Sequence, residues 1–296
     1  MDSSSLSLAR AALQSPFKRP RPDATAPDTR LTTTLTPDPH HLTAYERTCG
    51  FATGTGRERD VLPLTYPHVL AFPLAMRLMT ARDFPLPLLG LVHTSIDITQ
   101  HRPPHPTEEM RLDVRTTKLG PHRRGTEATV TTTARSAADE LLWESTSTYL
   151  ARHKTASSTA PAAKPRPRTE RPEATHTTEW RLGPDLGRRY AAVSGDRNPI
   201  HLHPLTARLF GFPRAIAHGM WTAARCLAEH TATQPEPHAQ PPTHTQTQTQ
   251  THAHVDFKAP VLLPATVTYT AHGPSRFELR GPDGTLHLTG EARTTT

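Results

Sequence analysis

The stretch YAAVSGDRNPIHLHPLTARLFGFPRAIAHGM, residues 190–220, places an acid and an imidazole five positions apart in a turn of glycine, asparagine and proline. Gly195 permits backbone angles that other residues avoid, and Pro199 fixes its own φ and keeps the residue before it out of the helical region. The segment is therefore expected to form a stiff bend. Such a bend would let the side chains of Asp196 and His201 converge on one point.

Two interpretations of this pair stay open. A carboxylate and an imidazole aimed at one point can hold a water molecule between them, one accepting a proton and the other positioning or returning it. Alternatively, Asp196 and Asn198 only satisfy backbone groups of the turn, and His201 lies on the surface. Spacing alone favours the second interpretation.

The composition indicates folded modules with loose connections. A chain of 296 residues predicts two compact units, or one unit with tails. Because only 34% of the residues are hydrophobic and 31 are prolines, part of the chain is expected to stay unpacked. The two cysteines lie far apart without a CxxC pattern, so they predict neither a disulfide framework nor a zinc site.

The charge favours an anionic partner. A net charge of +7 suits nucleic acid, the phosphates of coenzyme A or an acidic carrier protein. Scattered basic residues, 5% aromatic residues and the lack of a nucleic-acid motif argue against nucleic acid. No apolar run approaches the roughly 20 residues that span a bilayer, and the N-terminus has no secretory signal, so a soluble, cytoplasmic protein is expected.

Shifts in composition divide the chain. We expect a flexible N-terminal arm over residues 1–40, a first domain over residues 41–152 and a linker over residues 153–174, which are rich in proline, alanine and arginine. A second domain would follow over residues 175–296. It contains a low-complexity stretch at residues 231–254 with alternating threonine and glutamine, which is expected to be a surface loop.

The two domains share an order of elements. Each is expected to begin with an apolar helix, at residues 66–81 in the first domain and at residues 215–230 in the second. Alternating runs follow in each, and they predict antiparallel strands. These runs are residues 89–100, 108–119, 125–136 and 140–151 in the first domain, and 252–261, 263–272, 275–281 and 285–293 in the second.

Three segments of the second domain resemble the MaoC-like family of R-specific enoyl-CoA hydratases and dehydratases. They are YAAVSGDRNPIH, ARLFGFPRAIAHGMWTAA and VDFKAPVLLPATV, at residues 190–201, 207–224 and 255–267. The resemblance implies an α+β double hot dog fold, with two curved antiparallel sheets, each wrapped around a central helix. Residues 62–100 are similar to the N-terminal half of such proteins. That half lacks the Asp-x-Asn-Pro-x-His pattern, so it would be a degenerate domain beside a catalytic one.

The same resemblance implies a reaction. Asp196 and His201 would activate water for addition to a trans-2-enoyl thioester, or run the reverse dehydration of a (3R)-hydroxyacyl thioester. Ser194 and Asn198 would orient them. Gly219, at the start of a predicted helix, would offer its backbone N–H to the thioester carbonyl oxygen. The thioester would be carried by coenzyme A or an acyl carrier protein, and neither a cofactor nor a metal is expected.

Further assignments are less direct. His218 would shape the turn before the helix, with a second catalytic role as the alternative, and His203 would lie on the surface. Four aromatic and apolar side chains are available for an acyl pocket, although core packing is the default expectation for each of them: Phe210, Phe212, Met220 and Trp221.

The sequence leaves assembly and activity open in part. The two halves would form an internal pseudo-dimer that covers their sheet edges, with a homodimer also possible. Two other activities remain as alternatives: a non-catalytic hot dog protein that binds acyl thioesters, and a thioesterase.

Overall fold

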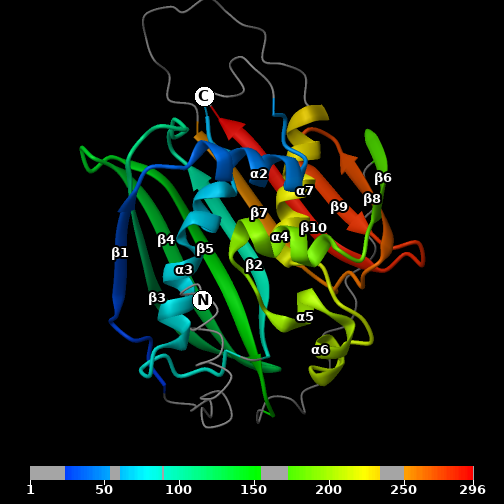
Figure 1. Ribbon diagram of the computed structural model, residues 1–296, viewed down its shortest axis with the longest axis horizontal. Coiled ribbons are helices and arrows are strands. Elements are labelled where there is room, and N and C mark those ends of the chain that lie inside the picture. The colour runs from blue at the N-terminus through cyan, green and yellow to red at the C-terminus, as the bar shows by residue number, and fades with distance from the viewer. Residues whose placement is uncertain (1–23, 54–60, 89, 155–172, 234–249, 296) are drawn as a thin grey trace, which may run out of the picture.

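The strands of the protein form one continuous antiparallel sheet. The computed structural model describes residues 24–53, 61–88, 90–154, 173–233 and 250–295. Its ten-stranded sheet has the order β1-β3-β4-β5-β2-β7-β10-β9-β8-β6, with β1 at one edge and β6 at the other (Figure 1).

Each half of the chain contributes five neighbouring strands. In the first half the elements are β1 Arg30–Leu35, α2 Pro39–Cys49, α3 Tyr66–Thr80, β2 Leu91–Gln100, β3 Met110–His122, β4 Gly125–Ser136 and β5 Leu141–Arg152. In the second half they are β6 His176–Leu182, α4 Leu186–Ser194, α5 Pro199–Leu202, α6 Pro204–Leu209, α7 Gly219–Thr233, β7 Gln250–Phe257, β8 Ala265–His272, β9 Arg276–Arg280 and β10 Leu286–Thr295. Within each half, the strand order from the outer edge is first, third, fourth, fifth, second. The halves therefore repeat one topology.

The two halves meet through backbone hydrogen bonds. Strand β2 pairs antiparallel with β7, from Ser95 opposite Asp256 to Gln100 opposite Thr251. The expectation of two separate sheets is therefore wrong, because β2 and β7, the inner edge strands of the two halves, pair and make one sheet. Pairing satisfies the N–H and C=O groups that an open edge would expose. The expectation that the halves cover each other's sheet edges agrees with this seam.

One long helix of each half lies against the sheet. Helix α3 contacts β3 and β4, and α7 contacts β9 and β10, so the helices cover the same face on either side of the seam (Figure 1). Both helices are largely buried; α3 continues through Pro73. Trp143 of β5, fully buried, donates from Nε1 to the carbonyl of Leu64 at 2.8 Å and so fastens the start of α3 to the sheet.

Some predicted boundaries are corrected. Within the predicted arm of residues 1–40, strand β1 pairs with β3, so this part is not a flexible tail. The loop predicted at residues 231–254 is shorter at both ends, because α7 continues to Thr233 and β7 begins at Gln250. The rest of that loop, most of the linker and residues 1–23 lie outside the described residues. No described helix has both the length and the apolar character needed to cross a membrane.

Candidate active site

The turn between α4 and α5 is held by its own side chains. Gly195 ends α4 with a left-handed φ of 72°, which glycine adopts without a steric penalty. The N–H of Asp196 donates to Ser194 Oγ at 3.2 Å, and the Asp196 Oδ1 atom accepts from the N–H of Asn198 at 3.1 Å. Asn198 in turn caps α5 by accepting from the N–H of Ile200. The Oδ1 atom of Asp196 therefore has the capping role that was considered for this residue. Its Oδ2 atom accepts no hydrogen bond from the backbone of the turn and is available to bind a water molecule.

His201 is fixed in one tautomer. It is buried on α5, and its Nδ1–H donates to the carbonyl oxygen of Ile216 at 2.8 Å. A neutral imidazole that donates from Nδ1 keeps a lone pair on Nε2. Burial lowers the pKa of His201 below its ordinary value, against the opposing effect of the Asp196 charge. The ring is therefore poised as a neutral base, and the surface position considered for it is wrong.

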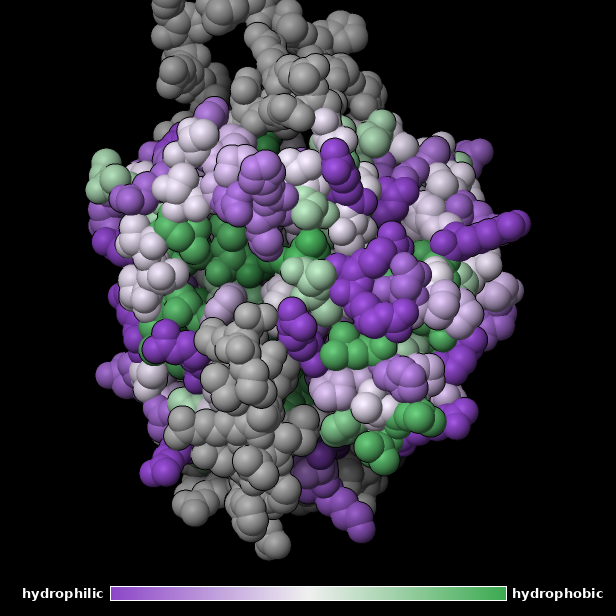
Figure 2. All heavy atoms as spheres, in the orientation of Figure 1, coloured by the Kyte–Doolittle hydropathy of each residue, from purple (hydrophilic) through white to green (hydrophobic). Residues whose placement is uncertain are grey.

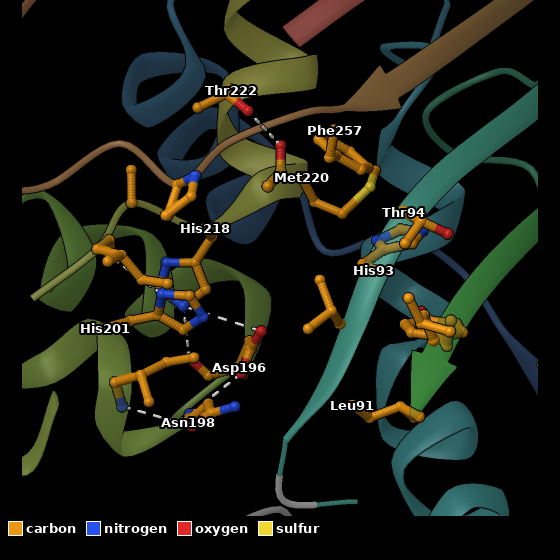
Figure 3. A pocket seen from close by; sticks show the side chains of 18 of the residues that line it. Leu91, His93, Thr94, Asp196, Asn198, His201, His218, Met220, Thr222 and Phe257 are labelled. Atoms are coloured by element: carbon orange, nitrogen blue, oxygen red, sulfur yellow. Dashed lines mark hydrogen bonds and ion pairs between the residues drawn. The ribbon is translucent and has the colours of Figure 1, made fainter. Parts of the chain in front are cut away.

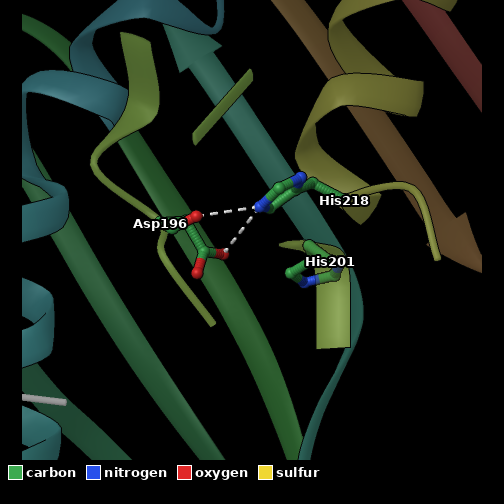
Figure 4. A group of neighbouring side chains, drawn as sticks. All are labelled: Asp196, His201 and His218. Atoms are coloured by element: carbon green, nitrogen blue, oxygen red, sulfur yellow. Dashed lines mark hydrogen bonds and ion pairs between the residues drawn. The ribbon is translucent and has the colours of Figure 1, made fainter. Parts of the chain in front are cut away.

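His218 completes a three-residue cluster. Its ring stacks on that of His201, with centroids 3.7 Å apart and planes 26° from parallel. Its Nε2–H donates to the backbone carbonyl of Asp196 at 3.0 Å, and the same nitrogen lies 3.9 Å from Asp196 Oδ2 (Figure 4). Burial, together with the neighbouring His201 ring, lowers the pKa of His218. His218 thus contacts both Asp196 and His201 from its position before α7.

The spacing within the cluster suits one bridging water. Ligand atoms of Asp196, His201 and His218 all lie within 4.8 Å of one another. A water molecule that bonds to a carboxylate oxygen and to a ring nitrogen at about 2.8 Å each spans such a gap. A metal ion is the other species that this spacing admits. Stacked rings direct their lone pairs along parallel planes, and one nitrogen of each ring already bonds a carbonyl. The His218 nitrogen near Asp196 Oδ2 is the one that donates to a carbonyl, so this nitrogen has no lone pair to offer a metal ion.

Gly219 begins α7 beside this cluster. The N–H of Thr222 bonds back to the carbonyl of His218, so Gly219 occupies the first turn, where backbone N–H groups have no partner within the helix. A Cβ at Gly219 would lie 3.3 Å from the ring of Phe257. Gly219 and Phe257 both line the cavity that adjoins this cluster. An amide at a helix N-terminus stabilises developing negative charge.

A cavity of about 610 Å³ connects these groups and is lined by both halves of the chain. Figure 3 shows the Asp196, His201 and His218 side chains on one wall, and Leu91, His93 and Thr94 of β2 on the facing wall. The cavity therefore lies over the seam of the sheet.

Two of the four residues considered for the acyl pocket line the cavity, and the other two do not. Phe212 and Met220 line the cavity. Trp221 does not, because it is buried among the helices and donates from Nε1 to the carbonyl of Thr48 at 2.9 Å. Phe210 is 37% exposed beside Leu205 and Leu209 of α6, where hydrophobic residues gather at the lower right of Figure 2. His203 is exposed as predicted, and its ring caps α6.

Comparison with known proteins decides the family. The chain is 37% identical over 290 residues to 3-hydroxyacyl-thioester dehydratase X of Mycobacterium tuberculosis, across 97% of this chain and 96% of the relative. The chain belongs to the MaoC-like dehydratase family. A family profile described as MaoC like domain matches residues 157–273. The relative is a hydro-lyase by name, and this chain is its homologue.

Solved structures agree with this assignment. A crystal structure of HtdX of Mycobacterium tuberculosis matches with a TM-score of 0.71 at 34% identity, covering 90% of this chain and all of that one. A MaoC-like dehydratase of Phytophthora capsici matches with a TM-score of 0.70 at 17% identity, covering 94% and 98% of the two chains, and this likeness concerns the fold alone. The hot dog fold expected from the sequence is thus confirmed for this MaoC-like chain.

The N-terminal half also contributes polar residues that the sequence interpretation missed. His68 of α3, His93 of β2 and Tyr149 of β5 all line the cavity. A signal was present, since YPHVLAF and LVHTSID each place one histidine within an apolar pattern. Such a histidine is satisfied within a core in most proteins, so the pattern alone did not indicate a site.

One glycine of this MaoC-like site offers a test of His201 placement. A Cβ at Gly187 of α4 would lie 1.9 Å from the carbonyl oxygen of His201. We expect Gly187→Ala to push α5 away from α4 and to lower kcat/KM about 100-fold, because small displacements of a catalytic group cost rates of this order. Gly120→Ala is the matched control, since its Cβ would meet only Lys118 Cε at 3.8 Å. Steady-state kinetics and thermal unfolding of both variants provide the measurement. Wild-type kcat/KM in Gly187→Ala would contradict the proposed packing.

Proposed function

We propose that this protein interconverts (3R)-hydroxyacyl and trans-2-enoyl thioesters by removing or adding water. The observation that carries the proposal is the water-bridging distance between the Asp196 carboxylate and His201, in a cavity that is also lined by Gly219, the first residue of α7. The 37% identity to a 3-hydroxyacyl-thioester dehydratase supports the same reaction. Coenzyme A or an acyl carrier protein would carry the acyl group.

Dehydration begins at C2 of the hydroxyacyl chain. The lone pair on His201 Nε2 removes a proton from C2, and the electrons of the broken C–H bond move toward the thioester carbonyl. The Gly219 N–H donates to the carbonyl oxygen as negative charge develops there. The carboxylate of Asp196 stabilises the imidazolium that forms, because opposite charges at this distance attract in a buried site.

The second half of the reaction releases water. The electrons at C2 form the C2–C3 double bond as the C3–O bond breaks, and His201 returns its proton to the departing oxygen. The resulting water lies between Asp196 Oδ2 and His201 Nε2. Hydration is the same sequence in reverse, starting from that water. The pair of Asp196 and His201 thus transfers the proton at both C2 and C3, and the first N–H of α7 stabilises the charge on the carbonyl oxygen.

Positively charged side chains at the cavity would bind the phosphate groups of coenzyme A or of the carrier protein's arm. Two exposed arginines line the cavity: Arg124, directly before β4, and Arg152, the last residue of β5. Lys258 lines it as well and forms an ion pair with Asp256 at 2.8 Å. Such cations suit the phosphates of coenzyme A or of a phosphopantetheine arm. A homodimer remains a prediction.

The function is tested with crotonyl-CoA and the purified 296-residue chain. Loss of the enoyl absorbance with formation of 3-hydroxybutyryl-CoA, without release of free thiol, is the expected result. Chiral analysis of the product should give the (3R) isomer. A thiol reagent added in parallel distinguishes a thioesterase, which would release coenzyme A. Stable binding of several thioesters without turnover would instead indicate a non-catalytic protein and contradict the proposal.

The pH dependence follows from the lowered pKa of His201. The base must be neutral, so activity is lost as the pH falls through the pKa of His201 and is retained above it. Burial places this pKa below the ordinary value of 6.5. The acid limb of a plot of kcat/KM against pH is therefore expected to have its midpoint below 6.5. Initial rates in buffers of constant ionic strength check this, and a midpoint above 6.5 would mean that the proton acceptor is not a buried neutral imidazole.

A further inference from the structure

Three exposed hydrophobic side chains gather on the short helix α6. Among the described residues, four large hydrophobic side chains are exposed, and three of them belong to α6 or directly follow it. Leu205 is 62% exposed, Leu209 82% and Phe210 37% (Figure 2). Single exposed leucines are common on protein surfaces, whereas a group of them marks a surface that binds another molecule. These three residues are named the α6 patch below.

The outward position of the leucines is set by the fold. Leu205 and Leu209 are four residues apart, so they lie on one face of α6, and Ala207 on the other side is fully buried. A helix on a protein surface normally turns its leucines toward the core. The Thr206 hydroxyl donates to the carbonyl oxygen of Pro199 at 2.6 Å and holds α6 in this orientation. The α6 patch is therefore a built part of the surface.

The α6 patch is connected to the cavity at both ends of the helix. Helix α5, which carries His201, ends one residue before α6 begins. Phe212, two residues after Phe210, lines the cavity, and its N–H donates to the carbonyl oxygen of Ala207 at 3.1 Å. A molecule that binds the α6 patch would therefore lie next to the wall of the cavity that holds the catalytic base.

Positive charge accompanies the α6 patch. Residues 197–228 include four arginines and no acidic residue. Arg208 of α6 and Arg214 after it are both exposed. Each side chain donates to a backbone carbonyl, of Pro213 at 3.3 Å and of Pro264 at 3.1 Å, and neither is paired with an acid among the described residues. An apolar centre with cations beside it suits a protein partner that is acidic.

The two carriers considered for the acyl group differ in what they offer this surface. Coenzyme A brings phosphates, which suit the cations of the cavity, but it has no apolar surface that could cover two leucines. An acyl carrier protein presents the same phosphopantetheine arm from a folded, acidic surface, so its charge complements the arginines. A carrier that binds and leaves in each turnover needs only a small, transient interface. The carrier protein is therefore the occupant that fits.

We propose that the α6 patch docks the protein part of an acyl carrier protein while its arm delivers the thioester to the cavity. The proposal rests on the proposed function for the reaction and extends it, because it makes the carrier protein the preferred carrier over coenzyme A. Leu205 and Leu209 form the apolar centre of this interface. Arg208 steers the acidic partner toward it.

The experiment compares one crotonyl group on two carriers, coenzyme A and the acyl carrier protein of the same organism. The wild-type protein is expected to hydrate the carrier-protein thioester with a kcat/KM about tenfold higher. Leu205→Ser combined with Leu209→Ser should lower that kcat/KM about tenfold, mainly through KM, because the interface loses its centre. The same variant should hydrate crotonyl-CoA like wild type, because neither leucine lines the cavity.

Arg208→Glu tests the charge beside the α6 patch. It should slow the carrier-protein reaction most at low salt, because electrostatic steering weakens as the salt concentration rises. Two matched controls change exposed residues in the first half of the chain. Val61→Ser removes the fourth exposed hydrophobic side chain, and Arg115→Glu reverses a charge on β3. Both controls should keep the wild-type ratio between the two substrates.

Binding of the apo carrier protein, which lacks the arm, separates this proposal from the proposed function. Fluorescence anisotropy of the labelled apo carrier protein should show binding to the wild-type protein and about tenfold weaker binding to the double leucine variant. This result supports the docking surface even where no thioester is hydrated. Hydration of crotonyl-CoA without any binding of the apo carrier protein would leave the dehydratase standing and remove the docking surface.

Three other results overturn the proposal. The first is a kcat/KM for the carrier-protein thioester that does not exceed that for crotonyl-CoA in the wild-type protein, a comparison that needs no variant. The second is an equal loss of both activities in the double leucine variant, which would give the leucines a structural role. The third is a change of oligomeric state in that variant, or loss of binding to phosphatidylglycerol vesicles, which would assign the α6 patch to a second copy or to a membrane.

Discussion

Replacing Asp196 by asparagine or His201 by alanine is expected to lower kcat/KM for crotonyl-CoA hydration by about 10³-fold or more. General acid–base catalysis by a positioned side chain contributes roughly 10²–10⁴-fold, and here the two groups share one water. The asparagine amide keeps an oxygen that can accept the Asn198 N–H, so the bond that holds the turn should survive while the negative charge is lost. The measurement is the initial rate of enoyl absorbance change at several substrate concentrations.

Two further observations belong to this prediction. Because the residues act as a unit, the double variant should be little slower than the slower single variant. His203→Ala is the matched control, since this exposed histidine lies two positions along the chain and outside the cavity, and its activity should stay near wild type. If both single variants melt like wild type and keep near-normal rates, the catalytic pair is elsewhere.

Removing the N–H of Gly219 is expected to produce the second-largest loss. Proline is tolerated at the first position of a helix, where its missing N–H costs no intrahelical bond, so Gly219→Pro removes the donor while α7 can still form. Loss of one oxyanion donor typically lowers kcat by about 10²–10³-fold. Because the donor acts on charge that develops in the transition state, the effect should fall on kcat more than on KM. Rates measured over a full range of substrate concentrations give kcat and KM separately and so check this expectation.

Gly219→Ala controls for crowding at the same position. It keeps the N–H but adds a Cβ about 3.3 Å from the Phe257 ring, so a moderate loss is expected from displacement of that ring alone. The proline variant must therefore be markedly slower than the alanine variant. Equal activities of the two variants would show that this N–H does not bind the carbonyl oxygen.

The regular elements were largely predictable, and the exceptions have a physical reason. The alternation of hydrophobic and polar residues predicted β2 to β5 and β7 to β10 to within a few residues. These strands have a neighbour on both sides and pack one face against the helices, so their hydrophobic pattern is strong. Strands β1 and β6 were missed. They are short outer strands, RLTTTL and HTTEWRL, that pair on one side only and bury few side chains, so their hydrophobic pattern is weak.

The seam between the halves could not be predicted from pattern. Nothing in the residues of β2 or β7 states that the two strands pair with each other, since alternation records the buried face and not the neighbour along the edge. The expectation of two sheets followed from counting one sheet for each helix. The continuous sheet matters for function, because the seam is what brings β2 of one half to the cavity of the other.

The candidate site was accessible from sequence only in part. The signature at residues 190–201 led to Asp196 and His201, whose convergence the bend explains. Met220 lines the cavity and the neighbouring Trp221 packs in the core, because adjacent residues of a helix point about 100° apart. The contributions of His68 and His93 required the fold, since their positions relative to Asp196 depend on the pairing of the two halves.

The most direct test of the central claim is an oxygen exchange experiment in ¹⁸O-labelled water, read by mass spectrometry. A (3R)-hydroxyacyl-CoA incubated with the protein should return as the intact thioester with one labelled oxygen on C3, because reversible loss and addition of water replaces that oxygen. The exchange should be absent in Asp196→Asn. Label in a released carboxylic acid, or no label at all with the wild-type protein, would contradict the account.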